Sequence, residues 1–191
     1  MSEESEPEEN PDLLPEFPNI RSLEKNFNIK QTPGEGNCLF FSLSYLIFQN
    51  FKYHVVIRQK ICDYLSEHNY NDDDRDRREA EEKINKMRND GVYGTGYELE
   101  AFSKLCKIRI TYYVRHIENM NKNKDDKLTR HVFGKEYPEN FAILLSDYGV
   151  VGELCNHYEA LEPKNNYNID KNKLQKIKDL LCNIDPNCNN K

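Results

Sequence analysis

Apolar residues recur every three or four positions in several separate stretches of the chain, which is the spacing of one helix face. Residues 38–49 carry Leu39, Leu43, Leu46 and Ile47 at this spacing and contain no charged residue, so we expect a buried helix there. Another stretch, residues 72–88, is dense in charge, so we expect it to be exposed to solvent. The pattern as a whole predicts helices over residues 38–49, 53–68, 72–88, 98–107 and 170–182.

Three other stretches have the pattern of strands. Residues 108–114 alternate between apolar and polar positions, which predicts a half-buried strand. Residues 141–145 are continuously apolar, which predicts a strand buried on both faces. A short strand is expected at 157–161, ahead of Pro163. Turn-rich loops are expected at 32–37, 94–96 and 147–152, and an exposed loop or hairpin tip at 118–129. Helices mixed with a few strands indicate an α/β (α+β) fold.

The ends of the chain differ from its middle. Residues 1–18 contain four prolines and seven acids with no base, so we expect a disordered acidic tail. Residues 19–165 are expected to form the folded domain. Residues 166–191 are expected to be a C-terminal helical extension, whose apolar stripe at Leu174, Ile177, Leu180 and Leu181 packs on the domain or on a partner. We favour packing on the domain.

Charge and cysteine content exclude several classes of protein. The 191 residues have a net charge of −6, but the acids of residues 1–18 account for it, since 26 acids and 27 bases remain. A domain with the basic field of a duplex-binding protein is therefore not expected, and we predict no nucleic-acid partner.

The longest apolar run, residues 38–48, is too short to span a membrane. The acidic N-terminus is unlike a secretory signal. The six cysteines, with no Cys-x-x-Cys pair, indicate reduced thiols in a cytoplasmic or nuclear protein.

The residues Gly34-Glu35-Gly36-Asn37-Cys38 lead directly into the first predicted helix. A thiol at a helix N-terminus lies at the positive end of the helix dipole, which stabilises the thiolate. The neighbouring glycines allow a sharp turn that exposes backbone N–H groups, and these can bind a developing oxyanion. Many cysteines are simply buried, but this setting favours a nucleophile.

A cysteine nucleophile needs a base, and the base needs a group that orients it. His157 begins a predicted strand near the end of the domain, and residues two apart in a strand share a face. Glu159 therefore lies on the same side as His157, and Cys38, His157 and Glu159 form a candidate set. The other four histidines are better explained as surface or boundary residues: His54, His68, His116 and His131.

Three blocks of the chain resemble the ovarian tumour (OTU) family of cysteine proteases. The segment Gly-Glu-Gly-Asn-Cys-Leu-Phe-Phe-Ser-Leu at 34–43 is similar to the family's nucleophile signature Asp-Gly-Asn-Cys-Leu-Phe-Arg-Ser. Residues 87–94 and 97–103 are similar to its middle block, and Asn-His-Tyr-Glu-Ala-Leu at 156–161 to its closing His-Tyr-x-x-Leu motif. The blocks follow one another in the family's order over about 31–163.

The resemblance implies a papain-related fold, with a small central sheet packed between helices, and deubiquitination as the activity. It implies that Cys38 attacks the carbonyl of the ubiquitin C-terminal glycine, that His157 is the general base and acid, and that Glu159 orients His157. The loop carrying Glu35 would bind the oxyanion. Substrate-binding positions would be Gly36, Asn37, Tyr93, Gly94, Thr95 and Gly96. No metal or organic cofactor is implied. The expected partner is ubiquitin, polyubiquitin or a ubiquitin-like modifier, with no membrane association, and we expect a monomer.

The chain departs from the family pattern at two important positions. Glu35 stands where the family usually has Asp, whose side chain is thought to brace the oxyanion loop, and Glu159 stands where it usually has Asp or Asn. A longer carboxylate can still orient an imidazole, as in hydrolases with a Ser-His-Glu triad. Tyr93 replaces the usual Trp, which is a mild change. The Glu35 departure motivates a second hypothesis, a ubiquitin-binding module of the same fold that is weakly active or inactive.

Two further alternatives have less support. A zinc site could be built from Cys155, His157, Cys182 and Cys188, but their spacings match known zinc sites poorly. A small basic patch at Lys122, Lys124, Lys127 and Arg130 could contact nucleic acid, but Asp125 and Asp126 lie within it.

Overall fold

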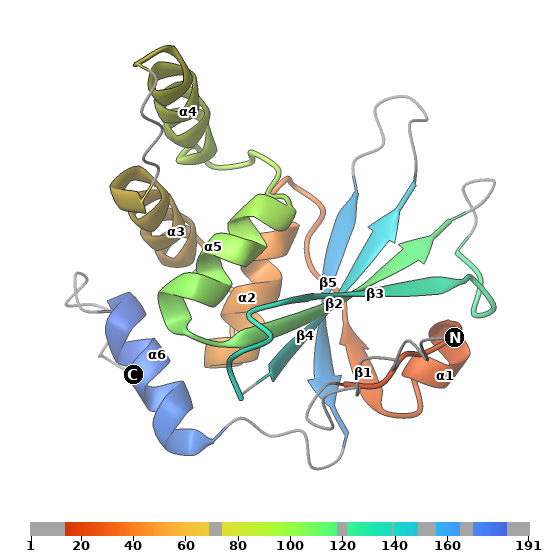
Figure 1. Ribbon diagram of the computed structural model, residues 1–191. Helices are drawn as coiled ribbons and strands as arrows, with labels where there is room; N and C mark the ends of the chain where they lie inside the picture. The colour runs from red at the N-terminus through yellow and green to blue at the C-terminus, as the bar shows by residue number, and fades with distance from the viewer. Residues whose placement is uncertain are drawn as a thin grey trace, which may run out of the picture.

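A mixed sheet forms the middle of the molecule, with helices on one face and the N-terminal segment on the other (Figure 1). The computed structural model describes residues 14–68, 74–117, 122–138, 140–148, 156–164 and 170–182. The architecture confirms the expected α/β fold with a small sheet between layers of other structure.

Five strands make up this sheet in the order β1-β5-β4-β2-β3. Neighbours are antiparallel except for the central pair β2 and β4, which is parallel. The strands are β1 Phe27–Lys30, β2 Arg109–His116, β3 Leu128–Phe133, β4 Asn140–Asp147 and β5 His157–Pro163. β2, β4 and β5 confirm the three predicted strands, while the two edge strands were not predicted. β1 has only four residues and β3 alternates without a clear apolar face, so neither has the pattern of a buried strand.

The prediction that β2 is half-buried is wrong. Ile110 and Val114 face the helices, as the alternation requires, but Thr111, Tyr113 and Arg115 on the other face are buried as well. The N-terminal segment covers Tyr113, and Arg115 is buried in an ion pair with Asp126 at 2.8 Å. β4 is buried on both faces, as predicted.

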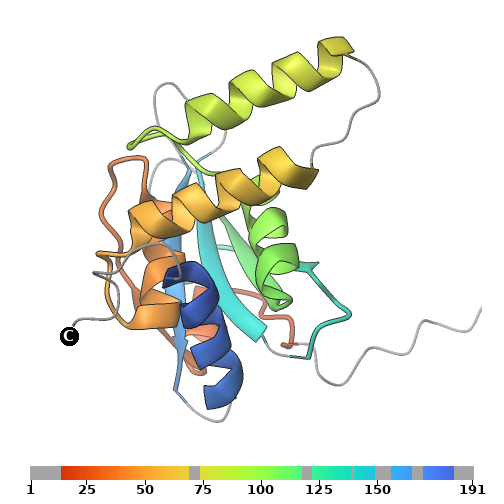
Figure 2. The same ribbon diagram turned by 90° about the vertical axis from the view of Figure 1, so that its left-hand side faces the viewer.

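Five helices cover one face of the sheet in successive layers (Figure 2). α2 and α5 lie on the strands, α3 packs on both of them, α4 packs on α3, and α6 packs on α2 and α3. α2 is buried on nearly all sides, which explains why its sequence is apolar all round. The bounds are α2 Cys38–Phe48, α3 His54–His68, α4 Asp74–Met87, α5 Gly96–Cys106 and α6 Lys171–Cys182, which confirm the five predicted helices within two residues at each end.

The other face of the sheet is closed by the segment that begins at Leu14 and by the short helix α1 (Ile20–Leu23). Leu14 and Phe17 are buried there, and the Phe17 ring lies 5.5 Å from that of Tyr113 in β2. The Tyr113 hydroxyl donates a 2.8 Å hydrogen bond to the Pro15 carbonyl oxygen. The expectation of a disordered tail is therefore wrong for residues 14–18, because their apolar side chains complete a second core. The rest of the expected tail lies outside the described residues.

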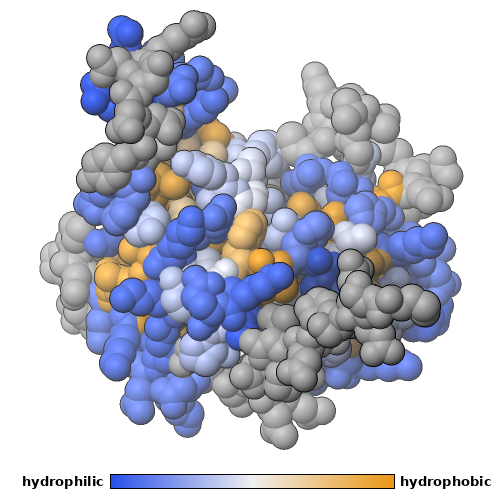
Figure 3. Space-filling model, in the orientation of Figure 1, coloured by the Kyte–Doolittle hydropathy of each residue, from blue (hydrophilic) through white to orange (hydrophobic). Residues whose placement is uncertain are grey.

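α6 belongs to the main core, as favoured for the C-terminal stripe. Ile177 and Leu181 are buried against α2 and α3, whereas Leu180 is partly exposed. Charged and polar side chains cover most of the visible surface around these helices (Figure 3). Within the described ranges, no helix is both long and apolar enough to cross a membrane.

Candidate active site

Cys38 is the first residue of α2 and lies beside the start of β5. Its side chain is buried, with 1% exposed, and its Sγ lies 4.0 Å from the backbone carbonyl oxygen of Asn156. His157 follows as the first residue of β5. Because α2 packs on β5, two residues that are 119 positions apart in the sequence occupy one site. A thiol and an imidazole in this setting are the elements of nucleophilic cysteine chemistry.

His157 is half-buried, and its ring meets the loop that precedes α2. Its Nε2 lies 3.4 Å from Oγ1 of Thr32, and the Thr32 hydroxyl donates a 2.5 Å hydrogen bond to the carbonyl oxygen of Tyr158. Burial lowers the pKa of His157 below its ordinary value, Glu159 opposes this shift, and Lys122 adds to it. The imidazole is therefore kept neutral, which suits a group that must accept a proton.

Glu159 shares the face of β5 with His157 but is hydrogen-bonded elsewhere. The carboxylate is buried, and its Oε1 accepts a short hydrogen bond from Nε2 of Gln31. Its Oε2 lies 4.0 Å from Nζ of Lys122. Among the described residues no hydrogen bond joins Glu159 to His157, so the carboxylate acts on the imidazole through its charge.

The loop before Cys38 is fixed by a buried arginine and by a second loop that crosses it. Asn37 Oδ1 accepts a 2.6 Å hydrogen bond from Arg58 of α3 and a 3.2 Å bond from the N–H of Gly91. Arg58 also donates to the carbonyl oxygens of Met87, at 2.9 Å, and Gly36, at 3.4 Å. The Asn37 side chain makes no capping hydrogen bond to α2, so it leaves the positive end of the helix to a ligand.

Only glycine fits at position 36, because the loop before Cys38 and the loop at Gly91 approach each other closely there. Its φ of +75° lies in the left-handed region, and a Cβ built there would be 1.9 Å from the carbonyl oxygen of Gly91. Backbone packed this tightly in front of a nucleophile presents rigid N–H groups, which is what an oxyanion site needs.

A family model described as OTU-like cysteine protease matches residues 33–158. The chain belongs to this family. The match includes the loop before Cys38, the crossing loop at Gly91 and the start of β5 with His157. No curated protein sequence matches the chain.

Solved structures of other OTU domains share the fold of this OTU-like protease at low sequence identity. The viral OTU domain protease from Dera Ghazi Khan virus is 20% identical, with a TM-score of 0.58 over 78% of this chain and 94% of that one. The Hazara virus OTU bound to ubiquitin is 14% identical, with a TM-score of 0.58 over 75% and 85% of the two chains. An OTU deubiquitinase from Wolbachia pipientis wMel bound to ubiquitin is 13% identical, with a TM-score of 0.51 over 74% and 98%.

Glu35 does not brace the loop of this OTU-like protease. Its side chain is exposed and makes no hydrogen bond or ion pair with any residue that the structure describes. The bracing comes instead from Asn37 and Arg58. The missing Asp of the family pattern therefore removes no contact on which the loop depends.

The segment from Tyr93 to Gly96 divides into two parts. The Tyr93 hydroxyl lies 3.5 Å from the carbonyl oxygen of Gly34, and Gly94 packs so closely on Leu39 of α2 that a Cβ would be 2.4 Å from its Cδ2. Both residues therefore border the nucleophile loop.

The other two residues of this segment serve α5. Thr95 is the N-cap of α5 and Gly96 is its first residue. The Thr95 hydroxyl donates to Glu98 at 2.8 Å and accepts from the N–H of Tyr97 at 3.2 Å. Thr95 therefore has a local role, which is to start α5. Its assignment as a substrate-binding residue rests only on its position in the family block.

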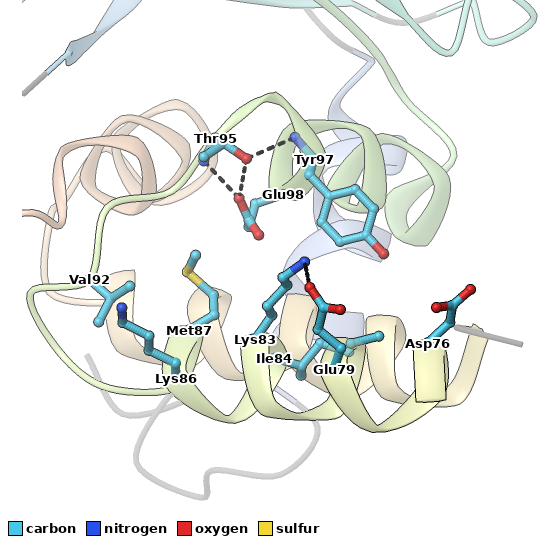
Figure 4. A pocket seen from close by; sticks show the side chains of 11 residues that line it. Asp76, Glu79, Lys83, Ile84, Lys86, Met87, Val92, Thr95, Tyr97 and Glu98 are labelled. Atoms are coloured by element: carbon cyan, nitrogen blue, oxygen red, sulfur yellow. Dashed lines mark hydrogen bonds and ion pairs between the residues drawn. The ribbon is translucent and has the colours of Figure 1, made fainter. Parts of the chain in front are cut away.

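A groove between α4 and the start of α5 lies beside these loops and has a volume of about 630 Å³. Figure 4 shows Met87 and Ile84 on its α4 side and Tyr97 on its α5 side, with Lys83 paired to Glu79 on the α4 side. Neither Cys38 nor His157 lines it, so this groove is not the catalytic cleft.

Three residues of the site were not singled out from the sequence: Gln31, Thr32 and Arg58. Arg58 carried a signal that could have been used, because it is adjacent to Ile57 and three positions before Ile61, within the apolar part of α3. A charged residue there needs buried partners. Gln31 and Thr32 had no comparable signal, since polar residues are common in loops.

Two alternatives from the sequence remain, the zinc site and the basic patch. Cys155 and Cys188 of the zinc hypothesis lie outside them, and the part of the chain that is described contains no group of three or more His, Cys, Asp and Glu able to hold a metal ion. In the basic patch, Lys124 pairs with Glu24 at 2.7 Å and Arg130 with Glu16 at 3.5 Å. The patch is thus partly neutralised by the chain's own N-terminal segment.

Proposed function

We propose that this OTU-like cysteine protease is a deubiquitinase that hydrolyses isopeptide bonds at the ubiquitin C-terminus. The observation that carries the proposal is the position of the Cys38 thiol, at the N-terminus of α2 and 4.0 Å from the carbonyl oxygen that immediately precedes His157. Support for ubiquitin as the partner comes from the solved OTU domains of Hazara virus and Wolbachia pipientis, which are bound to ubiquitin.

Each half of the reaction uses two proton transfers through one imidazole. His157 takes the proton of the Cys38 thiol, and the sulfur forms a bond to the carbonyl carbon of the terminal glycine. Backbone N–H groups at the start of α2 bind the oxyanion while the bond to the lysine nitrogen breaks. His157 then gives its proton to the departing amine. Water hydrolyses the thioester, with His157 again as the base, and the free thiol returns.

Rigid backbone, more than charged side chains, shapes the approach to the nucleophile. Tyr93 and Gly94 border the loop before Cys38, and the close approach of Gly36 and Gly91 brings this loop against the loop that crosses it. Glycine backbone beside the nucleophile suits the slender Gly-Gly end of ubiquitin, which has no side chain to place.

The test uses a ubiquitin probe that carries a C-terminal electrophile. We expect rapid covalent labelling that is abolished in Cys38→Ala and in His157→Ala. Cys182→Ala and His131→Ala are the matched controls, because each removes the same residue type away from the site, and both should be labelled at the wild-type rate. A wild-type protein that binds ubiquitin tightly without being labelled would support the alternative of an inactive binding module.

The proposal extends to substrate preference and to the cellular compartment. A panel of all diubiquitin linkages, with Cys38→Ala as the control, will show which chains are cleaved, and a panel of ubiquitin-like modifiers will show whether ubiquitin is the preferred substrate. We further propose a monomeric protein in the cytoplasm or nucleus. The free thiols of Cys38, Cys62, Cys106 and Cys182 are in keeping with a reducing compartment.

A further inference from the structure

We propose that Thr32, and not Glu159, is the residue that fixes the tautomer and orientation of His157. The inference rests on the proposed function, because it assigns a positioning residue to the same proton transfer. Thr32 lies between β1 and α2, is nearly buried, and was not indicated by any motif.

The hydrogen-bonding capacity of the Thr32 hydroxyl determines which ring nitrogen carries hydrogen. A hydroxyl has one hydrogen to donate, and the carbonyl oxygen of Tyr158, 2.5 Å away, can only accept it. Toward Nε2 of His157, at 3.4 Å, the Thr32 oxygen is therefore an acceptor. Nε2 must then bear the hydrogen, and in a neutral imidazole this leaves the lone pair on Nδ1.

With Nε2 carrying the hydrogen, the lone pair of Nδ1 is the one available to the thiol. Nδ1 is the ring nitrogen nearer to the backbone, and Cys38 Sγ lies against the carbonyl of Asn156, the residue just before His157. The proton of the thiol therefore moves to Nδ1, while Nε2–H stays bonded to Thr32. In a wrong tautomer the imidazole presents N–H to the thiol and cannot act as its base.

Glu159 makes no hydrogen bond to the His157 ring in the described part of the chain. Its Oε1 is bonded to the Gln31 side chain, and its Oε2, which has no hydrogen-bond partner there, faces Lys122 at 4.0 Å. The carboxylate stabilises positive charge on His157 from a distance, which does not select between the two ring nitrogens.

The experiment measures the tautomer of His157 directly by long-range ¹H–¹⁵N NMR, at a pH above the range in which histidine titrates. The variants are Thr32→Val, which removes the acceptor, Thr32→Ser, which keeps it, and Glu159→Gln, which keeps the shape of the carboxylate. His157→Gln identifies the His157 signals. The kcat and KM for a ubiquitin–fluorophore conjugate, and the thermal unfolding midpoint, are measured on the same proteins.

We expect the Nε2–H tautomer in the wild type, in Thr32→Ser and in Glu159→Gln. Thr32→Val should show mixed tautomers and a loss of about ten-fold in kcat with KM unchanged, as the loss of one buried hydrogen bond predicts. A purely structural role of Thr32, as the partner of the Tyr158 carbonyl, would lower the unfolding midpoint without moving the tautomer.

The proposal is overturned by an Nδ1–H tautomer in the wild type, by a Thr32→Val protein that keeps either the wild-type tautomer or the wild-type kcat, or by a Thr32→Ser protein as impaired as Thr32→Val. If Thr32→Val does not fold, the tautomers of the wild type, Thr32→Ser and Glu159→Gln still decide. The NMR measurement needs no ubiquitin, so a protein that does not cleave ubiquitin would contradict the proposed function alone.

Discussion

Gly36 is the residue with the least freedom to change. A side chain there would overlap the carbonyl of Gly91, and its φ of +75° is unfavourable for any residue with a Cβ. We expect Gly36→Ala to reduce probe labelling by about ten-fold or more, since the loop must shift by more than the active site tolerates. Gly34→Ala is the control, because no atom lies within 4 Å of its Cβ position. Equal labelling of the two variants would contradict the assignment.

Arg58 carries a buried charge whose hydrogen-bond partners are the loop before Cys38 and the C-terminal end of α4. Burial lowers the pKa of its guanidinium, and the group stacks 3.8 Å from the centre of the Phe40 ring. Arg58→Lys keeps the charge but cannot reach Met87, Gly36 and Asn37 together. We expect a loss of about 2–4 kcal/mol in the free energy of unfolding, measured in urea, and a lower kcat.

Glu35→Ala is the control for this variant, because the side chain of Glu35 is exposed and makes no hydrogen bond or ion pair with another described residue. It should leave both the stability and kcat near wild-type values. A large effect in Glu35→Ala, with none in Arg58→Lys, would show that the loop is braced as in the family pattern.

The pH dependence of the reaction follows from the surroundings of His157. Burial lowers its pKa, so the neutral base persists below the ordinary histidine range, and activity is lost only as the pH falls through this lowered value. Lys122 contributes to the lowering. In Lys122→Gln the pKa of His157 should rise, and the acid limb of the kcat/KM profile should move to higher pH. A shift toward lower pH would contradict this account.

At the scale of elements, α6 is part of the main core. Ile177 is buried against α2 and α3, so Ile177→Ala should cost about 2–4 kcal/mol in urea unfolding, from lost burial and the cavity left behind. Leu180, one turn along the same helix, is 38% exposed, and Leu180→Ala should cost much less. A similar small effect of both changes would show that α6 packs loosely and is dispensable.

α2 and β5 are the two elements that assemble the site. α2 is a helix because its apolar residues repeat at helical spacing, and it is buried because this repeat covers nearly its whole circumference. β5 is hydrogen-bonded on both sides, to β1 and β4, which holds His157 in register with Ser146. The site therefore rests on rigid elements, while its specific contacts come from the loop at 31–37.

At the scale of the whole molecule, the sheet is closed on both faces by parts of the chain that are distant in sequence. Phe17 packs on Phe27 of β1 and on Tyr113 of β2, at ring distances of 6.2 and 5.5 Å. Phe17→Ala should lower the free energy of unfolding by about 3 kcal/mol. Glu16→Gln is the control, since the side chain of Glu16 is 74% exposed. An unfolding midpoint that is the same for both variants would mean that the N-terminal segment does not stabilise the domain.

The sequence by itself determined the five long helices and the three inner strands, and it indicated a helix-initial cysteine and a strand-initial histidine as candidate catalytic residues. These features follow from periodicity and from local chemistry, which are properties of adjacent residues. Cys38 and His157 were identified because each starts a segment whose pattern is strong.

Only the tertiary structure decided which polar residues meet. Glu159 and His157 share a face, as the strand period requires, yet Gln31 takes the carboxylate and Thr32 takes the ring nitrogen. The tertiary structure also decided the burial of Leu14 and Phe17, the two edge strands and the role of Arg58. Each depends on side chains that are brought together from distant positions, and hydrogen-bond partners of this kind are selected by three-dimensional proximity, which no local pattern records.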